Sequence, residues 1–229
     1  MLPDPLYEAA KAVAPYGNEE HVRAITRACV DAGHRVLQIH RLGATDAEHV
    51  AALLELADLP HGAAVLDAGC GVGAVAALMA EQRPDLHITL LNVSPAQLAM
   101  CPPPFPQIAA SFHDIPVPDA SYDAVLFLYS IGHAQIETAL AEAARVLRPG
   151  GVLFIYDLTA TDPSRVIAAL GYVPHSTSRL LKAAASFFHK EHVCIPETTV
   201  DRFFEIMDRD TYADIFKGVH PVIYRMVRR

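Results

Sequence analysis

Several features that would assign the chain to a well-known class are missing. The four cysteines, Cys29, Cys70, Cys101 and Cys194, form no CxxC pair, which favours reduced thiols in a cytoplasmic protein. No apolar run approaches the roughly 20 residues that a membrane-spanning helix needs. The first residues show neither the charged nor the apolar region of a signal peptide. We therefore expect no membrane insertion.

Strong positive charge and a metal-ligand cluster are missing as well. The formal net charge of −8 argues against a broad nucleic-acid surface. Twelve histidines are scattered along the chain. The nearest to a ligand pair, His189 and His192, lack a carboxylate-rich partner cluster, so no metal is predicted. The chain does have 229 residues, of which 52% are hydrophobic, enough for one α/β domain with an appendage.

The periodicity of the apolar residues changes near Ala63. Residues 1–60 have helical spacing and predict a helical N-terminal segment, whereas residues 61–229 alternate strands with helices. Apolar strands between amphipathic helices indicate a parallel sheet that is covered on both faces. The predicted fold is therefore α/β, a Rossmann-like doubly wound sheet. Strands are expected at 64–68, 87–92, 107–111, 123–129 and 151–157, with a last strand at 222–227.

The tail is predicted to form a helical C-terminal cap, an insertion at about 174–215. Helices are expected at 178–188 and 199–209, and a strand at 172–176 would place both helices between the final two strands. Such an insertion would cover the carboxyl edge of the sheet, where ligands bind in this architecture.

The stretch Val65–Gly73 reads as a buried strand that enters a glycine-rich turn and opens a helix. Gly69, Gly71 and Gly73 allow the backbone to approach a ligand closely, and the helix N-terminus offers free N–H groups and a positive dipole end. This arrangement suits the carboxylate or phosphate of a nucleotide-like cofactor. A dinucleotide is the rival ligand, but its fold usually places an acidic residue at the end of the next strand. Here that residue is Asn92.

Two later segments distinguish these cofactors. Residues 112–125 read as a strand, an acidic turn and a second strand, and residues 145–153 read as a helix end, a turn and a strand. Together with the glycine turn, they resemble the class I S-adenosylmethionine-dependent methyltransferase family over residues 62–157. The resemblance implies that S-adenosylmethionine is the cofactor and that residues 61–229 form the methyltransferase domain.

The resemblance also implies roles for individual residues. The three glycines would lie against the methionine end of the cofactor, and Asp67 would organise the turn and reach the amino group. Asp114 would accept a hydrogen bond from the adenine amino group. Asn92 departs from the family's usual acidic residue but can still bond a ribose hydroxyl. The full cofactor-binding set is Asp67, Gly69, Gly71, Gly73, Asn92, Val93, Gln97, His113, Asp114 and Ile115.

The end of the fourth strand faces the methyl group in this family. Tyr129 and His133 follow that strand and are the predicted catalytic residues, and a histidine could remove a proton during methyl transfer. The Asn-Pro-Pro-Tyr signature of amide and amino-purine methylation is missing. The predicted substrate-lining residues are Tyr16, His40, Tyr156, Phe187 and Phe188.

The sequence therefore predicts methyl transfer from S-adenosylmethionine to a small molecule, such as a natural product, a lipid-like compound or an isoprenoid, in secondary metabolism. The segment at Asn92 resembles a branch that methylates isoprenoid diphosphates on carbon, but that branch usually has a glutamate near Tyr129. O- or N-methylation stays equally open. The alternatives outside this class are an NAD(P)-dependent oxidoreductase and a non-catalytic cofactor-binding protein. We expect a cytoplasmic protein with no nucleic-acid partner, and a homodimer is an open alternative.

Overall fold

The computed structural model describes residues 4–13, 40–198 and 209–229. Tyr16 and about half of the predicted N-terminal helical segment lie outside these residues, as does most of the helix expected at 199–209. The helices are α1 (Pro5–Val13), α3 (Asp46–Ala57), α4 (Ala74–Gln82), α5 (Pro95–Leu98), α6 (Ile136–Val146), α7 (Ser164–Leu170), α8 (Thr177–Ala184) and α10 (Arg209–Ile215), with a 3-10 turn, η1, at Ile131–His133. The strands are β1 (Ala64–Ala68), β2 (His87–Asn92), β3 (Gln107–Ala109), β4 (Tyr122–Leu128), β5 (Leu147–Ala160), β6 (Phe188–Cys194) and β7 (Val219–Arg228).

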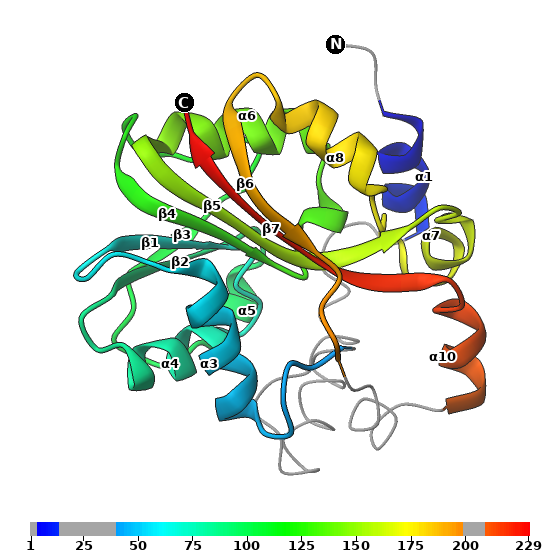
Figure 1. Cartoon of the computed structure of the whole chain (residues 1–229), viewed down its shortest axis with the longest axis horizontal. Coiled ribbons are helices and arrows are strands. Elements are labelled where there is room, and N and C mark those ends of the chain that lie inside the picture. Colours follow the sequence, from blue (N-terminus) through cyan, green and yellow to red (C-terminus); the bar gives the residue numbers. More distant parts are fainter. Residues whose placement is uncertain (1–3, 14–39, 199–208) are drawn as a thin grey trace.

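The seven strands form one sheet in the order β3-β2-β1-β4-β5-β7-β6. Strands β1 to β5 run parallel to one another, and β7 is antiparallel to both β5 and β6. Helices α3, α4 and α5 cover one face, and α6 and α8 cover the other (Figure 1). The predicted α/β doubly wound fold is confirmed. The order reverses between β1 and β4, so the carboxyl ends of these two strands mark the edge where ligands bind in such sheets.

Alternating side chains of the central strands build a core on each face of the sheet. Leu66, Val125 and Phe127 point toward α6 and α8, whereas Val65 and Leu126 point toward α3 and α4. All five side chains are fully buried, which explains why these strands read as continuous apolar runs.

Local sequence signals fix where the helices that flank the edge begin. Thr45 caps α3, because its hydroxyl accepts the N–H of Glu48 while the Glu48 carboxylate accepts the N–H of Thr45, each over 3.1 Å. These two reciprocal bonds form a capping box. Ser94 caps α5 in the same way, accepting the N–H of Gln97 over 3.3 Å. Helix α5 stays short, since three prolines follow at 102–104.

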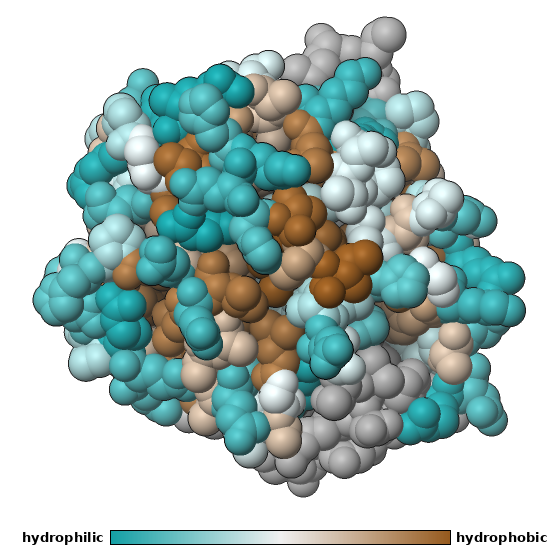
Figure 2. Space-filling view, viewed as in Figure 1, coloured by the Kyte–Doolittle hydropathy of each residue, from teal (hydrophilic) through white to brown (hydrophobic). Residues whose placement is uncertain are grey.

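The first part of the predicted C-terminal cap is wrong. Residues 172–176 form no strand, and the sixth strand is Phe188–Cys194, which the sequence analysis read partly as helix. Helix α8 buries Leu180 and Ala184 against the face that α6 also covers. Of the connection between β6 and β7, the described part includes α10, which directly precedes β7. Apolar side chains gather in the middle of the face shown in Figure 2, over the sheet between α3 and α8.

None of the helices in the described residues is long and apolar enough to cross a membrane. Nor do the described side chains contain a group of three or more His, Cys, Asp or Glu residues that could hold a metal ion.

Candidate active site at the carboxyl edge

The loop after β1 crosses the end of β2 and turns into α4. The N–H groups of Gly69 and Cys70 both donate to the carbonyl oxygen of Leu91, over 2.8 and 3.1 Å. Gly69, Gly71 and Gly73 have φ values of +87°, +57° and +73°, a region that glycine enters without steric cost. The predicted glycine turn therefore needs glycine for backbone conformation at all three positions.

Only one of the three glycines faces open space. A Cβ added at Gly69 would lie 2.6 Å from the Cβ of Ser130, and one at Gly73 would lie 3.1 Å from the Sγ of Cys101. Among the residues that the structure describes, a Cβ at Gly71 would meet no atom within 4 Å. Gly71 is thus the point where a ligand can approach the backbone, whereas the other two are close-packed against the protein.

The turn also presents a free helix end. Gly73 occupies the N-cap position of α4, and no side chain of the described residues caps that helix. Its first N–H groups therefore offer donors and a positive dipole end toward the sheet edge. Asp67, the penultimate residue of β1, lies just before the turn and is 4% exposed. Burial raises the pKa of this carboxyl to about 7, so a cationic amino group nearby would favour its ionised form.

Asn92 ends β2 and holds two loops together. Its side-chain amide donates to the carbonyl oxygen of Gly71 over 3.1 Å and to the Oε1 of Gln97 over 2.7 Å. Its Oδ1 accepts the N–H of Ser94 over 3.1 Å. Both amide hydrogens are thus used within the protein, and Asn92 shapes the turn around Gly71. The neighbouring Val93 is 47% exposed, which leaves an apolar side chain at this edge.

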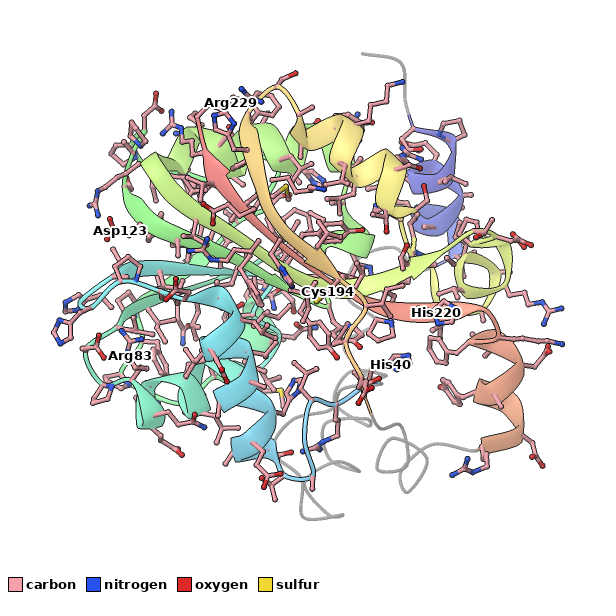
Figure 3. The ribbon with its side chains drawn as sticks, viewed as in Figure 1. His40, Arg83, Asp123, Cys194, His220 and Arg229 are labelled. Atoms are coloured by element: carbon pink, nitrogen blue, oxygen red, sulfur yellow. The ribbon has the colours of Figure 1, made fainter. Side chains whose placement is uncertain are left out.

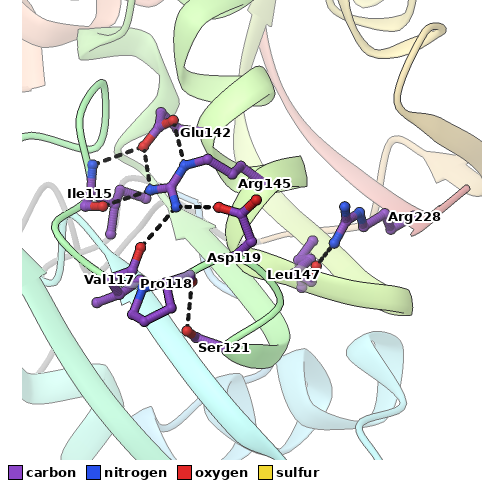
Figure 4. A network of polar contacts seen from close by, with 9 residues as sticks. All are labelled: Ile115, Val117, Pro118, Asp119, Ser121, Glu142, Arg145, Leu147 and Arg228. Atoms are coloured by element: carbon purple, nitrogen blue, oxygen red, sulfur yellow. Dashed lines mark hydrogen bonds and ion pairs between the residues drawn. The ribbon is translucent and has the colours of Figure 1, made fainter.

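The acidic loop after β3 is held by one arginine of α6. The Arg145 guanidinium donates to the carbonyl oxygens of Ile115 and Val117 over 2.6 and 2.8 Å, and to the carboxylates of Glu142 and Asp119 over 2.9 Å (Figure 4). Glu142 also accepts the N–H of Ile115 over 2.9 Å. These bonds fix the backbone that carries Asp114. The sequence analysis assigned no role to Arg145, although it starts the third of the quoted segments.

The three residues predicted to surround adenine have different environments. Asp114 is exposed and its carboxylate is available at the surface. Ile115 is 1% exposed and belongs to the core beneath the loop. His113 is half-buried: its Nδ1 pairs with the Oγ of Ser111 over 3.0 Å, and its Nε2 accepts the N–H of Gln135 over 2.9 Å. Burial lowers the pKa of His113, so it is neutral in this position.

Tyr129, the first residue after β4, has a φ of +57°, which is strained for a residue with a side chain. Its N–H donates to the carbonyl oxygen of Tyr156 over 2.8 Å. The two rings meet edge to face with centroids 5.1 Å apart, and their hydroxyls hydrogen-bond each other. Burial raises the pKa of the Tyr129 hydroxyl well above its usual value. Tyr129 therefore keeps its proton at neutral pH and cannot serve as a base there.

Both hydroxyls also hold the backbone of His40. The N–H of His40 donates to the Tyr129 hydroxyl over 3.3 Å, and the Tyr156 hydroxyl donates to the His40 carbonyl oxygen over 2.8 Å. The Nδ1 of His40 pairs with the Oγ1 of Thr198 over 3.1 Å. Burial and the nearby His220 lower the pKa of His40 to about 4. Figure 3 places His40 and His220 at the carboxyl edge of the sheet. The predicted catalytic residue Tyr129 and two predicted substrate-lining residues, His40 and Tyr156, thus meet in one cluster.

A buried carboxylate that the sequence analysis missed supports the loop after β4. Asp157 of β5 is 1% exposed, and its Oδ2 accepts the N–H of Ile131 over 3.1 Å. Its Oδ1 accepts the hydroxyl of Tyr172. The Tyr172 ring meets His133 edge to face at 4.8 Å. A single acidic residue at the end of an apolar strand was the available signal.

His133 lies in the short turn η1 and is largely buried. Burial lowers the pKa of its imidazole to about 4, so the ring is neutral at pH 7 and can accept a proton. His133 follows Ser130 on the same loop. The Ser130 hydroxyl donates to the carbonyl oxygen of Ala68 over 2.6 Å. The loops after β1 and β4 are therefore in direct contact.

The prediction that Phe187 and Phe188 line the substrate site is wrong. Phe188 is 2% exposed, packs in the core and pairs with Arg228 at the amino edge of the sheet. The Phe187 carbonyl oxygen accepts the N–H of Arg229 over 3.0 Å. Figure 3 shows Arg229 at the top of the view, well away from His40 at the lower right. Tyr16 lies outside the described residues.

Comparison with known proteins identifies the central segment. Residues 66–155 match a family model described as a methyltransferase domain. The chain is 35% identical over 94 residues to the malonyl-[acyl-carrier protein] O-methyltransferase of Dechloromonas aromatica, and 31% identical over 149 residues to the demethylmenaquinone methyltransferase of Tropheryma whipplei. These matches cover 41% and 62% of this chain, but only 36% and 61% of the relatives. The chain thus spans roughly a third to three fifths of their length.

Solved structures share the fold over nearly the whole chain. Geranyl diphosphate C-methyltransferase from Streptomyces coelicolor A3(2) superposes with a TM-score of 0.76 at 15% identity, covering 99% of this chain and 100% of that one. The [4+2]-cyclase SpnF superposes with a TM-score of 0.72 at 18% identity, covering 91% and 93%. At these identities the likeness establishes the fold alone.

Proposed function

We propose that this chain, which carries a methyltransferase domain over residues 66–155, transfers a methyl group from S-adenosylmethionine to a small molecule. The observation that carries the proposal is the turn at Gly71, which faces open space between the N-terminus of α4 and the end of β2. The matched segment contains this turn. The methyltransferase relatives favour this function over the nicotinamide-dependent oxidoreductase that the sequence left open.

The residues around the turn fit the chemical parts of S-adenosylmethionine. The uncapped N–H groups of α4 suit a carboxylate, and the Asp67 carboxyl suits an ammonium group. The exposed Val93 side chain offers an apolar surface for an adenine ring, and the exposed Asp114 carboxylate can accept from its amino group. When bound, the sulfonium supplies an electrophilic methyl group that an acceptor atom can attack directly.

On the acceptor side, the residues of this chain mainly position the acceptor molecule and exclude water from it. Tyr129 and Tyr156 fix the backbone at His40, and holding an acceptor near the methyl carbon lowers the entropic part of the barrier. His133 is neutral at pH 7 and is the proposed proton acceptor. Tyr129 occupies the position where a carbon-methylating branch usually has glutamate, so we favour an acceptor that already carries a lone pair, such as a hydroxyl or amine.

The wider setting follows from the same proposal. We place the protein in the cytoplasm, which agrees with the free thiols of Cys70, Cys101 and Cys194, and in secondary metabolism. A small molecule is the proposed partner. The homodimer and the lack of a nucleic-acid partner stay predictions.

Calorimetric titration with S-adenosylhomocysteine tests the cofactor site. The Gly71→Val variant should bind at least tenfold more weakly than the parent, because its side chain would enter the space that faces the cofactor. The matched control is Gly150→Val. Gly150 also has a positive φ, +78°, and also faces open space, but it lies at the start of β5, remote from the edge. Absence of binding by the parent at high micromolar ligand, or equal loss in both variants, would refute the assignment.

A further inference from the structure

Two cysteine thiols meet beside the glycine turn. Cys70 lies within the turn and Cys101 follows α5. Their Sγ atoms lie 3.6 and 3.7 Å from the same atom, the carbonyl oxygen of Gly71. The Cys101 Sγ also lies 3.5 Å from the carbonyl oxygen of Gln97, and neither thiol is part of a disulfide.

Backbone packing also brings the segments that carry these two thiols together. The N–H of Gly73 donates to the Cys70 carbonyl oxygen over 2.9 Å, so both residues belong to one tight turn. A Cβ on Gly73 would lie 3.1 Å from the Sγ and 3.2 Å from the Cβ of Cys101. Cys101 therefore packs directly on the turn that contains Cys70. A disulfide needs its two sulfur atoms about 2 Å apart, so the two thiols that share the Gly71 carbonyl oxygen would have to move toward each other.

We propose that Cys70 and Cys101 form a redox-modification site, at which a peroxide produces a reversible disulfide that weakens binding of S-adenosylmethionine at the adjacent turn. The effect on cofactor binding rests on the proposed function, whereas the disulfide itself does not. No other thiol of the described residues contacts this pair, because Cys194 lies at the end of β6.

The chemistry balances with peroxide as the two-electron oxidant. The thiolate of one cysteine attacks a peroxide oxygen, the O–O bond breaks, and a sulfenic acid forms while the other oxygen leaves as water. The second thiol then attacks the sulfenic sulfur, forming the S–S bond and releasing a second water. Cys101 is the first nucleophile, because the hydrogen bond from the Cys70 thiol lowers the pKa of Cys101.

Oxidation would remove hydrogen-bond donors from the carbonyl oxygen of Gly71 in the glycine turn. The Gly71 carbonyl oxygen now faces three donors: the Cys70 thiol, the Cys101 thiol and the amide of Asn92. A disulfide removes both S–H donors and draws the turn toward the end of α5. The Gly71 peptide, which faces the open side, should rotate as a result. We expect the affinity for S-adenosylhomocysteine to fall at least tenfold.

The test uses the full-length Cys29→Ser/Cys194→Ser variant, in which Cys70 and Cys101 are the remaining cysteines. The protein is treated with hydrogen peroxide, alkylated and analysed by peptide mass spectrometry. Calorimetry with S-adenosylhomocysteine is then run on the reduced, the oxidised and the dithiothreitol-treated protein. We expect a peptide pair linked through Cys70 and Cys101, a loss of affinity of tenfold or more, and recovery after reduction.

Each other result decides one part of the proposal. Two alkylated thiols after peroxide, or a sulfinic acid on one cysteine in place of the linked peptides, would refute the reversible disulfide. A disulfide with unchanged affinity would refute its effect on the cofactor. A disulfide in a protein whose reduced form binds no S-adenosylhomocysteine would support the modification site and refute the proposed function. In the Cys101→Ser variant, whatever its starting affinity, peroxide should cause no change.

Discussion

Replacing Gly132 with alanine tests whether the loop after β4 is positioned by the packing of Tyr172. A Cβ at Gly132 would lie 2.3 Å from both the Cε1 and the Cζ of the Tyr172 ring, whereas carbon atoms normally stay about 3.5–4.0 Å apart. The backbone at Gly132 has no positive φ, so the effect of Gly132→Ala is purely steric. Either the ring or the loop must move by more than 1 Å, judged from that contact range.

The cost can be worked out from what the ring holds. Overpacking a core position costs about 1–3 kcal/mol. If the ring moves, the Oδ1 of the buried Asp157 loses the Tyr172 hydroxyl and keeps the N–H of Leu158, and the loss of one such hydrogen bond costs about 1 kcal/mol. We expect Gly132→Ala to lower the free energy of unfolding by about 3 kcal/mol, measured by urea denaturation. Because His133 follows directly, methyl transfer should also slow.

Making Gly132→Ala in a second protein, Tyr172→Leu, distinguishes the steric contact with the Tyr172 ring from a general destabilisation of the loop by alanine. Leucine at position 172 lacks both the Cε1 and the Cζ atoms, so in the Tyr172→Leu protein the Gly132→Ala change should cost less than about 1 kcal/mol. An equal cost in both backgrounds would refute the reasoning, as would a Gly132→Ala protein as stable as the parent.

Two further predictions concern the acidic loop and pH. Arg145→Met should lower the free energy of unfolding by about 2 kcal/mol, because two backbone carbonyls lose their donor, and it should also weaken S-adenosylhomocysteine binding. The control Arg148→Met removes a surface ion pair with Asp123 and should lower the free energy of unfolding by less than about 1 kcal/mol. Urea denaturation and calorimetric titration of both variants measure the two effects. At about pH 5 the unfolded chain should bind about four more protons on histidines with pKa lowered to about 4 and about two fewer on carboxyls with pKa raised to about 7. The net two protons make the free energy of unfolding rise by about 2.7 kcal/mol per pH unit, and a flat or falling profile in urea denaturation would contradict this. The groups are His40, His49, His133, His175, Asp67 and Asp157.

The sequence predicted the parallel part of the sheet because its strands are buried on both faces. Leu90 and Leu91 at the end of β2 are both fully buried, so they read as a strand without any alternation. Strand β6 carries the opposite signal. Its central residues, 189–192, are all exposed at the edge of the sheet, so neither an apolar run nor an alternation marks it. The pairing with β7 that creates this strand is a tertiary contact.

A residue type alone does not reveal where its side chain lies in the fold or which groups already bond it. Phe187 and Phe188 are adjacent aromatics, and the sequence could not tell that they begin a strand at the amino edge. Asn92 was predicted to bind ribose, yet its amide is engaged by Gly71 and Gln97. The spacing of Asn92, Ser94 and Gln97 does indicate a local turn. The assignment of Asn92 to the cofactor stays a prediction.

Strain at Tyr129 connects the cofactor side of the edge with the acceptor side. A residue with a side chain at a φ of +57° costs about 1–2 kcal/mol, and here the Tyr156 carbonyl oxygen and the His40 backbone offset that cost. The sharp bend turns the next residue, Ser130, onto Gly69, where its hydroxyl reaches the carbonyl oxygen of Ala68. The loop that would hold the cofactor and the loop that would hold the acceptor therefore share one close contact. A side chain at Gly69 would push Ser130 away and displace both, so the two halves of the site cannot shift independently.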